Sequence, residues 1–172
     1  GALGYPGTRA RTLTVQGSTG GVLASVVANN TGATSVTKSG TGTWTLSGTN
    51  TYTGVTTISG GTLSVGVLAA GGASSNIGAS SNAAANLVLD GGTLKYTGDA
   101  VSTDRLFTIT FNGGTLDASG SGTLTFANTT SLAYSGSSVR TLTLTGTGNG
   151  YFSPVIADGA DLTSVVKNGA GT

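Results

Sequence analysis

The sequence of 172 residues contains no cysteine, no histidine, no methionine and no glutamate. Without cysteine there can be no disulfide, so thiols give no indication of the redox compartment. General acid–base catalysis relies chiefly on histidine and on positioned carboxylates, and aspartate is the only carboxylic side chain present. An enzyme is therefore the least favoured class of function.

Charge and long apolar runs are also scarce. Only 8% of the residues are charged and the formal net charge is +1, which excludes a field strong enough to attract nucleic acid or anionic lipid. No apolar run approaches the roughly 18 residues needed to cross a bilayer, so this segment is not expected to insert into a membrane. The opening residues 1–15 lack the apolar stretch of a signal peptide. We therefore expect Gly1 not to be the first residue of the gene product.

Small residues dominate what is present. The chain has 31 glycines, and glycine, serine and threonine together make up roughly half of it, a strong compositional bias. A flexible linker would lack apolar residues, but here 37% of residues are hydrophobic and they are regularly spaced. The composition predicts an ordered β structure with small polar residues facing outward or forming turns, and it fits an exported bacterial surface protein.

A long internal repeat organises the chain. The segment Arg11–Val15 (RTLTV) returns as RTLTL at 140–144, which is 129 residues further on, and the match continues without a gap to Thr172. Lys38 is thereby paired with Lys167. We interpret residues 1–43 as the end of one copy and 44–172 as one complete copy, continuous as one solenoid. We expect the sequence to be a window from a longer tandem array.

Shorter echoes predict the fold. The motif GGTL occurs at 60–63, 91–94 and 113–116, and short alternating runs indicate strands; these runs are 43–47, 56–60, 62–66, 86–90, 105–111, 123–126 and 139–146. GGTL motifs that recur at the same position in successive turns favour a right-handed parallel β-helix, with five or six turns per copy. An antiparallel β-sandwich is the alternative. The alanine- and glycine-rich stretch 69–85 is interpreted as a long loop.

Residues 38–66, KSGTGTWTLSGTNTYTGVTTISGGTLSVG, resemble the autotransporter-associated β-strand repeat, also called the passenger-associated transport repeat. The motif residues to which we assign a structural role are Lys38, Gly40, Gly42, Trp44, Leu46, Gly48, Asn50, Tyr52, Gly54, Gly61 and Leu63, with Lys167, Gly169 and Gly171 in the second copy. The resemblance implies an exported bacterial surface protein with a β-helical stalk. Known members are mainly passenger domains whose repeats are structural.

These observations favour a structural extracellular segment, a stalk or a filament or surface-layer building block, which associates with neighbouring repeats and with other copies. The alternative is an adhesin module that binds glycans or other cells through projecting loops such as 67–86. No motif indicates a cofactor, and the calcium-binding GGxGxD array is absent.

The acidic residues offer two candidate sites. Asp99 and Asp104 with Arg105 form the densest charged group, but turn formation and a surface ion pair explain it better than catalysis. Asp158 and Asp161 could contribute to an ion site. Turn formation explains them better, because the second acid has no acidic counterpart in the earlier copy.

Two further pairs concern the repeat motif itself. Trp44 and Tyr52 would stack on sugars if both were exposed on one face; otherwise they pack between turns. Asn50 and Asn86 are predicted to point inward or to occupy turns, with their amides bonded to the neighbouring turn. The threonine-rich run 141–148 resembles an ice-binding array, but glycine and asparagine interrupt it.

Overall fold

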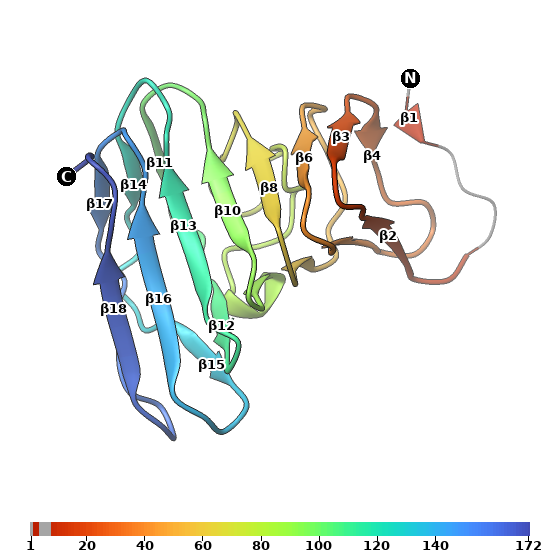
Figure 1. Cartoon of the computed structure of the whole chain (residues 1–172). Helices are drawn as coiled ribbons and strands as arrows, with labels where there is room; N and C mark the ends of the chain where they lie inside the picture. Colours follow the sequence, from red (N-terminus) through yellow and green to blue (C-terminus); the bar gives the residue numbers. More distant parts are fainter. Residues whose placement is uncertain (1, 4–7) are drawn as a thin grey trace.

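The protein is described by a computed structural model that covers residues 2–3 and 8–172. Over these residues the chain winds as a β-solenoid of about 7 turns, and every strand ladder in it is parallel. Figure 1 shows the turns stacked from the N-terminal to the C-terminal end. The parallel solenoid predicted from the sequence is confirmed. The alternative of an antiparallel sandwich is wrong, because such a fold pairs its strands antiparallel.

The turns build three faces, which we call the first, second and third face. The first face is a six-stranded sheet of β2 (Arg11–Val15), β5 (Thr34–Lys38), β7 (Thr56–Ile58), β9 (Leu87–Leu89), β12 (Thr108–Thr110) and β15 (Ala133–Ser135). The second face has seven strands: β3 (Gly20–Leu23), β6 (Thr43–Leu46), β8 (Thr62–Val65), β10 (Thr93–Tyr96), β13 (Gly114–Ala118), β16 (Arg140–Thr145) and β18 (Thr163–Lys167).

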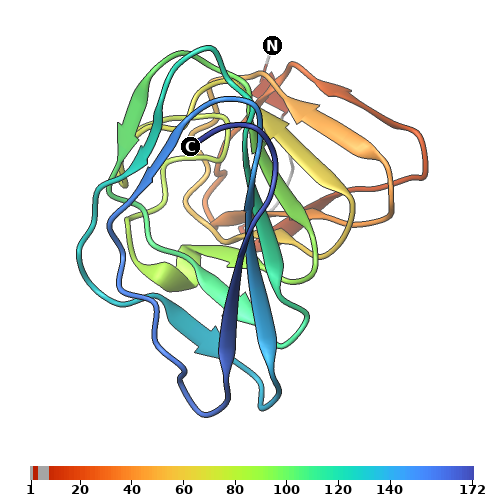
Figure 2. The same ribbon diagram turned by 60° about the vertical axis from the view of Figure 1, so that its left-hand side comes forward.

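The third face is less regular than the other two. It contains the three-stranded sheet of β11 (Val101–Thr103), β14 (Leu124–Phe126) and β17 (Gly150–Phe152). Nearer the N-terminus, β1 (Ala2–Leu3) pairs with β4 (Val26–Val27). A single turn of 3-10 helix, η1 (Ala84–Asn86), leads into β9. Figure 2 shows the faces enclosing the interior of the solenoid.

Alternation along each strand decides which side chains enter this interior. In β5, β7 and β9 buried and half-buried residues alternate strictly, as expected when successive side chains point to opposite faces of a sheet. Threonine fills many of the outward positions, where its β-branched side chain suits the pleat. The inward positions carry the aliphatic residues that form one continuous core.

The GGTL echoes lie in one column, as predicted. Leu63 of β8 is in register with Leu94 of β10, and Leu94 with Leu116 of β13. On the third side of the core the aromatic rings of Phe107, Phe126 and Phe152 pack together, with neighbouring centroids 5.8 to 6.0 Å apart. Like side chains therefore stack on like along the axis, and each turn buries the apolar surface of the previous one.

A column of glycines lies at the corner between the second and third faces. A Cβ added to Gly98 would lie 2.1 Å from the carbonyl oxygen of Gly66, and one added to Gly120 would lie 2.1 Å from that of Gly98. The backbones of successive turns thus come too close for any side chain at this corner. Gly148 and Gly171 continue the column.

We predict that Gly120→Ala lowers the urea midpoint of unfolding, with a loss of about 2 kcal/mol or more, because the methyl group would overlap backbone that cannot move alone. Gly66→Ala is the matched control, since its nearest atom would be 4.0 Å from the added Cβ. Circular dichroism during urea titration measures both. Equal midpoints for the two variants would contradict the close approach.

Candidate functional site

Lys38 is the first polar residue of the motif, and it points into the solenoid. It is fully buried and stands in the inward column between Val15 and Ile58. Its Nζ donates to the carbonyl oxygens of Ser39, Gly40 and Gly60 at 2.8 to 2.9 Å, and burial lowers the pKa of this amine. Three carbonyls, one of them in the next turn, therefore hold the cation in place of a carboxylate.

Asn50 and Asn76 form a ladder between turns. Asn50 Oδ1 accepts from the backbone N of Val27 in the preceding turn at 2.8 Å, and its Nδ2 donates to the carbonyl of Asn76 at 2.6 Å. Asn76 in turn accepts from two backbone N–H groups with Oδ1 and donates to the carbonyl of Gly48 with Nδ2. Both side chains are buried. The structure therefore gives Asn50 the bridging position expected from the motif.

Asn86 differs from that expectation. Its Nδ2 donates to the carbonyl and the hydroxyl of Ser81, within the same loop. It lies at the end of η1, half-buried, where it fastens a local turn and makes no bridge to the neighbouring turn. The prediction that its amide is bonded to the neighbouring turn is therefore wrong for Asn86.

Tyr52 is fully buried, and its hydroxyl lies 2.7 Å from that of Thr56. Burial raises the pKa of this phenol, while the bond to Thr56 and the nearby charge of Arg105 oppose the rise to a lesser extent. Trp44 also points inward, in the column of Leu63, with its ring beneath Gly21 and its Nε1 donating to the carbonyl of Gln16 at 3.0 Å. Tyr52 is therefore packed inside the solenoid, while half-buried Trp44 lies against the preceding turn, and the two rings do not form one exposed stacking platform.

Arg105 anchors the loop that the sequence indicates at 67–86. Its guanidinium donates to five carbonyl oxygens and one hydroxyl of that loop, those of Ala69, Ala70, Ala73, Gly78 and Ser80, the last through both its carbonyl and its Oγ. Arg105 is itself buried, and burial lowers its pKa, opposed by the charges of Tyr52 and Asp104. This residue holds the loop against the solenoid from within.

The expectation that this loop projects from the rod is therefore wrong for much of its length. Leu68 and Ile77 belong to the core, and Ser75 and Ser80 are buried. What remains exposed is mainly the tip around 70–74 and the stretch 81–85. The sequence could indicate this anchoring only through Arg105 itself, because five of its six acceptors are backbone carbonyls, which any residue provides.

The predicted group of Asp99, Asp104 and Arg105 is not a reactive cluster. Asp104 accepts from the backbone N of Gly71 at 2.7 Å and from Asn82 Nδ2 at 2.8 Å, which ties down the anchored loop. Asp99 accepts from Ser121 Oγ at 2.6 Å, one turn further on. Each carboxylate thus fastens a different corner, and Arg105 binds carbonyls.

The second acidic pair has an equally local role. Asp158 Oδ1 accepts from the backbone N of Thr163 at 3.1 Å, and its counterpart Asn29 accepts from Thr34 at 2.8 Å. Asp158 therefore closes the same turn in the second copy as asparagine does in the first. Among residues 2–3 and 8–172 no group of three or more acidic side chains lies close enough together to hold a metal ion.

The motif glycines stand where turns approach most closely. A Cβ at Gly40 would lie 2.8 Å from the carbonyl oxygen of Gly17, and one at Gly42 would lie 2.5 Å from the nitrogen of Gly20. Gly169 and Gly171 approach the turn beneath them in the same way. Similar close contacts occur at Gly48, Gly54 and Gly61, while Leu46 and Leu63 are fully buried in the core.

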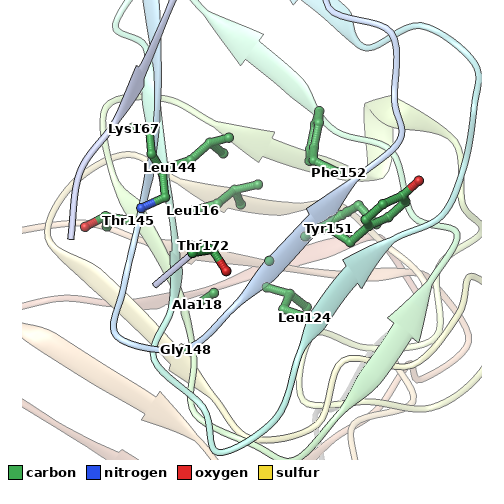
Figure 3. A pocket seen from close by; sticks show the side chains of 12 residues that line it. Leu116, Ala118, Leu124, Leu144, Thr145, Gly148, Tyr151, Phe152, Lys167 and Thr172 are labelled. Atoms are coloured by element: carbon green, nitrogen blue, oxygen red, sulfur yellow. The ribbon is translucent and has the colours of Figure 1, made fainter. Parts of the chain in front are cut away.

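One hollow stands out, at the C-terminal end of the solenoid (Figure 3). It encloses about 370 Å³. Its lining is mainly apolar and includes Leu116, Leu124, Phe126, Leu144 and Phe152, with Lys167 and Thr172 at its edge. These are side chains of the inward columns, so the hollow is the solenoid core seen at its last turn.

Lys167 lies at the edge of this hollow and corresponds to Lys38 in the repeat. Its Nζ donates to the carbonyls of Asn168 and Gly169, which correspond to two of the three acceptors of Lys38. The third acceptor of Lys38, the carbonyl of Gly60, belongs to the following turn. Lys167 therefore keeps the bonds to its own corner that Lys38 makes.

These features define a parallel β-solenoid repeat protein whose interior polar residues bridge one turn to the next. Residues 36–65 match the family model of the passenger-associated transport repeat. The chain is also 43% identical over 98 residues to the adhesin BmaC autotransporter of Brucella suis biovar 1 (strain 1330). That match covers 54% of this chain and 3% of the relative.

The resemblance read from the motif is thereby confirmed, and the chain carries an autotransporter passenger repeat. It is a segment of a β-helical protein that is secreted or on the cell surface. No solved structure matches the chain. In the described ranges, no helix has the length and apolar character required to cross a membrane.

We predict that Asn50→Leu destabilises the protein by about 2 to 4 kcal/mol, because it leaves the amide of Val27 and the carbonyl of Asn76 buried without partners. Asn86→Leu is the control, since Asn86 bonds only within an exposed loop. Urea unfolding followed by circular dichroism measures the difference. Similar losses for both variants would show that the buried ladder contributes nothing special.

A second prediction concerns alkaline pH. An unfolded tyrosine ionises near pH 10, whereas burial raises the pKa of Tyr52 in the folded protein. The folded state therefore retains a proton that the unfolded state loses, and its stability falls above pH 10 by up to about 1.4 kcal/mol per pH unit from this residue. Tyr52→Phe should be less stable at pH 8 but lose stability less steeply above pH 10. Parallel stability curves from pH 8 to 11.5 would contradict this.

Proposed function

We propose that this chain is a structural segment of a large bacterial surface or secreted protein, acting as a stiff stalk or filament building block. The observation that carries the proposal is the use of the buried polar side chains. Lys38, Asn50 and Arg105 form hydrogen bonds with backbone carbonyl and amide groups of the solenoid itself. The proposal assigns no catalysis, cofactor or metal to this segment.

Mechanical continuity follows from the same contacts. Each turn shares ladder hydrogen bonds and a continuous apolar core with its neighbours, so the stability of the rod is approximately the sum of contributions from its turns and from the interfaces between neighbouring turns. The outward strand positions carry mainly uncharged threonine and serine. Such a surface is hydrated and weakly repulsive, which suits rods that pack side by side.

The relative's name supports a second candidate function. The adhesin BmaC autotransporter is described as an adhesin, and the exposed tip 70–74 of the anchored loop is available for contact. Under this alternative the segment binds a glycan or another cell. A glycan array probed with the wild-type chain and with a variant shortened at the tip tests it, because tip-dependent binding would favour the adhesin role.

The stalk proposal is tested by length. Residues 44–172 are appended once and then twice after Thr172, which continues the repeat without a gap, and the three chains are compared by electron microscopy. At about 4.8 Å per turn, each addition should lengthen a thin particle by about 26 Å. Ordered bundles would favour the filament role. Compact particles of unchanged length would overturn the proposal.

A further inference from the structure

The two copies of the repeat keep the same local pairing. Arg11 of β2 is in register with Thr34 of β5, and the equivalent Arg140 of β16 is in register with Thr163 of β18. Lys38 and Lys167 both cap the glycine turn that follows their strand. Strand, turn and partner strand have thus been copied as a unit.

The copied unit nevertheless lies on a different face. β2 and β5 belong to the first face, while their counterparts β16 and β18 belong to the second. β3 belongs to the second face, while its counterpart β17 belongs to the third. In Figure 1, β16 and β18 stand in the same row as β3 and β6, not in the row of β2.

The fourth equivalent segment completes the cycle. Val26 belongs to β4, which lies between the second and the first face along the chain, and its counterpart Val155 forms a parallel bridge with Ser131, next to β15 of the first face. Every equivalent segment has therefore moved forward by one face. The shift is a property of the whole copy.

Counting turns gives the size of this step. Along the first face the chain passes from β2 through β5, β7, β9 and β12 to β15, which is five turns, and β16 then follows on the next face. One copy of 129 residues is therefore five turns and one third. The corner that follows the copied strand is built alike in both copies, which allows it to serve on either face. Lys38 donates to the carbonyls of the next two residues at a first-to-second corner, and Lys167 does so at a second-to-third corner.

We infer that successive copies of this repeat rotate by one face, so that equivalent surfaces point in three directions around the solenoid. The inference rests on the proposed role as an extended stalk. The exposed tip of the anchored loop would then recur about every 26 Å along the axis, each time a third of a turn further round. A partner would meet the rod from all sides, and the same surface returns to one side only after three copies.

The first test uses the chain as it is, and its lack of cysteine makes introduced pairs unambiguous. Thr115→Cys with Thr143→Cys joins neighbours on the second face, at a spacing that a disulfide tolerates. We expect this pair to oxidise to a disulfide, detected by peptide mapping. Thr108→Cys with Thr143→Cys should remain reduced, because the two positions lie on different faces.

A control pair separates the inference from the fold. Thr93→Cys with Thr115→Cys joins neighbours on the second face that both precede the returning segment at Arg140, and any parallel solenoid of this register should link them. The inference is overturned if the control pair forms a disulfide, Thr108→Cys links to Thr143→Cys, and Thr115→Cys does not link to Thr143→Cys. Equivalent strands of the two copies would then lie on the same face. The fold would stand in that case.

The second test reads the rotation directly. In the chain extended by residues 44–172, Ser74→Cys and its equivalent in the added copy are labelled with gold and located by electron microscopy. We expect labels about 26 Å apart along the rod and a third of a turn apart around it. Labels on the same side of a rod would overturn the inference and leave the stalk proposal standing, whereas particles that are not rods would overturn the stalk proposal itself.

Discussion

Close stacking of one turn on the next is the constraint on which the rest of this structure depends. Parallel strands lie about 4.8 Å apart, and the corners must keep that spacing where no strand pairing guides them. Glycine is the only residue that fits where backbones approach as closely as at Gly98 and Gly120. The glycine content that first suggests a linker is therefore a requirement of close packing.

The same constraint governs the polar residues of the interior. A corner leaves carbonyl and amide groups without ladder partners, and buried groups of this kind are costly unless bonded. Lys38 satisfies three carbonyls at one corner, and Asn50 satisfies an amide and a carbonyl in two different turns. Long or amide side chains can do this because they reach across one turn spacing. The hydrogen bonds of these side chains hold the turns together.

The sequence predicted the elements that obey this stacking rule. The alternating runs became strands, and the GGTL echoes became a column in register, because both patterns repeat what each turn requires. Arg105 was misjudged as part of a surface ion pair, since its true partners are backbone carbonyls, which any residue provides. The shift of one face between copies could not be predicted from the sequence either, because it depends on the summed length of all the turns in a copy. These turns differ in length: Val36 pairs with Thr56 in the next turn, and Thr56 pairs with Leu87 in the turn after that. No local motif records their sum.

The inward orientation of three of the seven basic side chains has a consequence for proteolysis. Lys38, Arg105 and Arg140 are 0%, 2% and 1% exposed, and trypsin-like proteases need a basic side chain in their specificity pocket and an extended backbone in their cleft. At these three residues neither is available unless the turns separate locally. Since opening one turn breaks ladders on both sides of it, the arrangement that stabilises the stack also protects these three positions. Cleavage by such proteases is thereby directed to the basic residues that remain on the surface, such as Lys95 and Lys167.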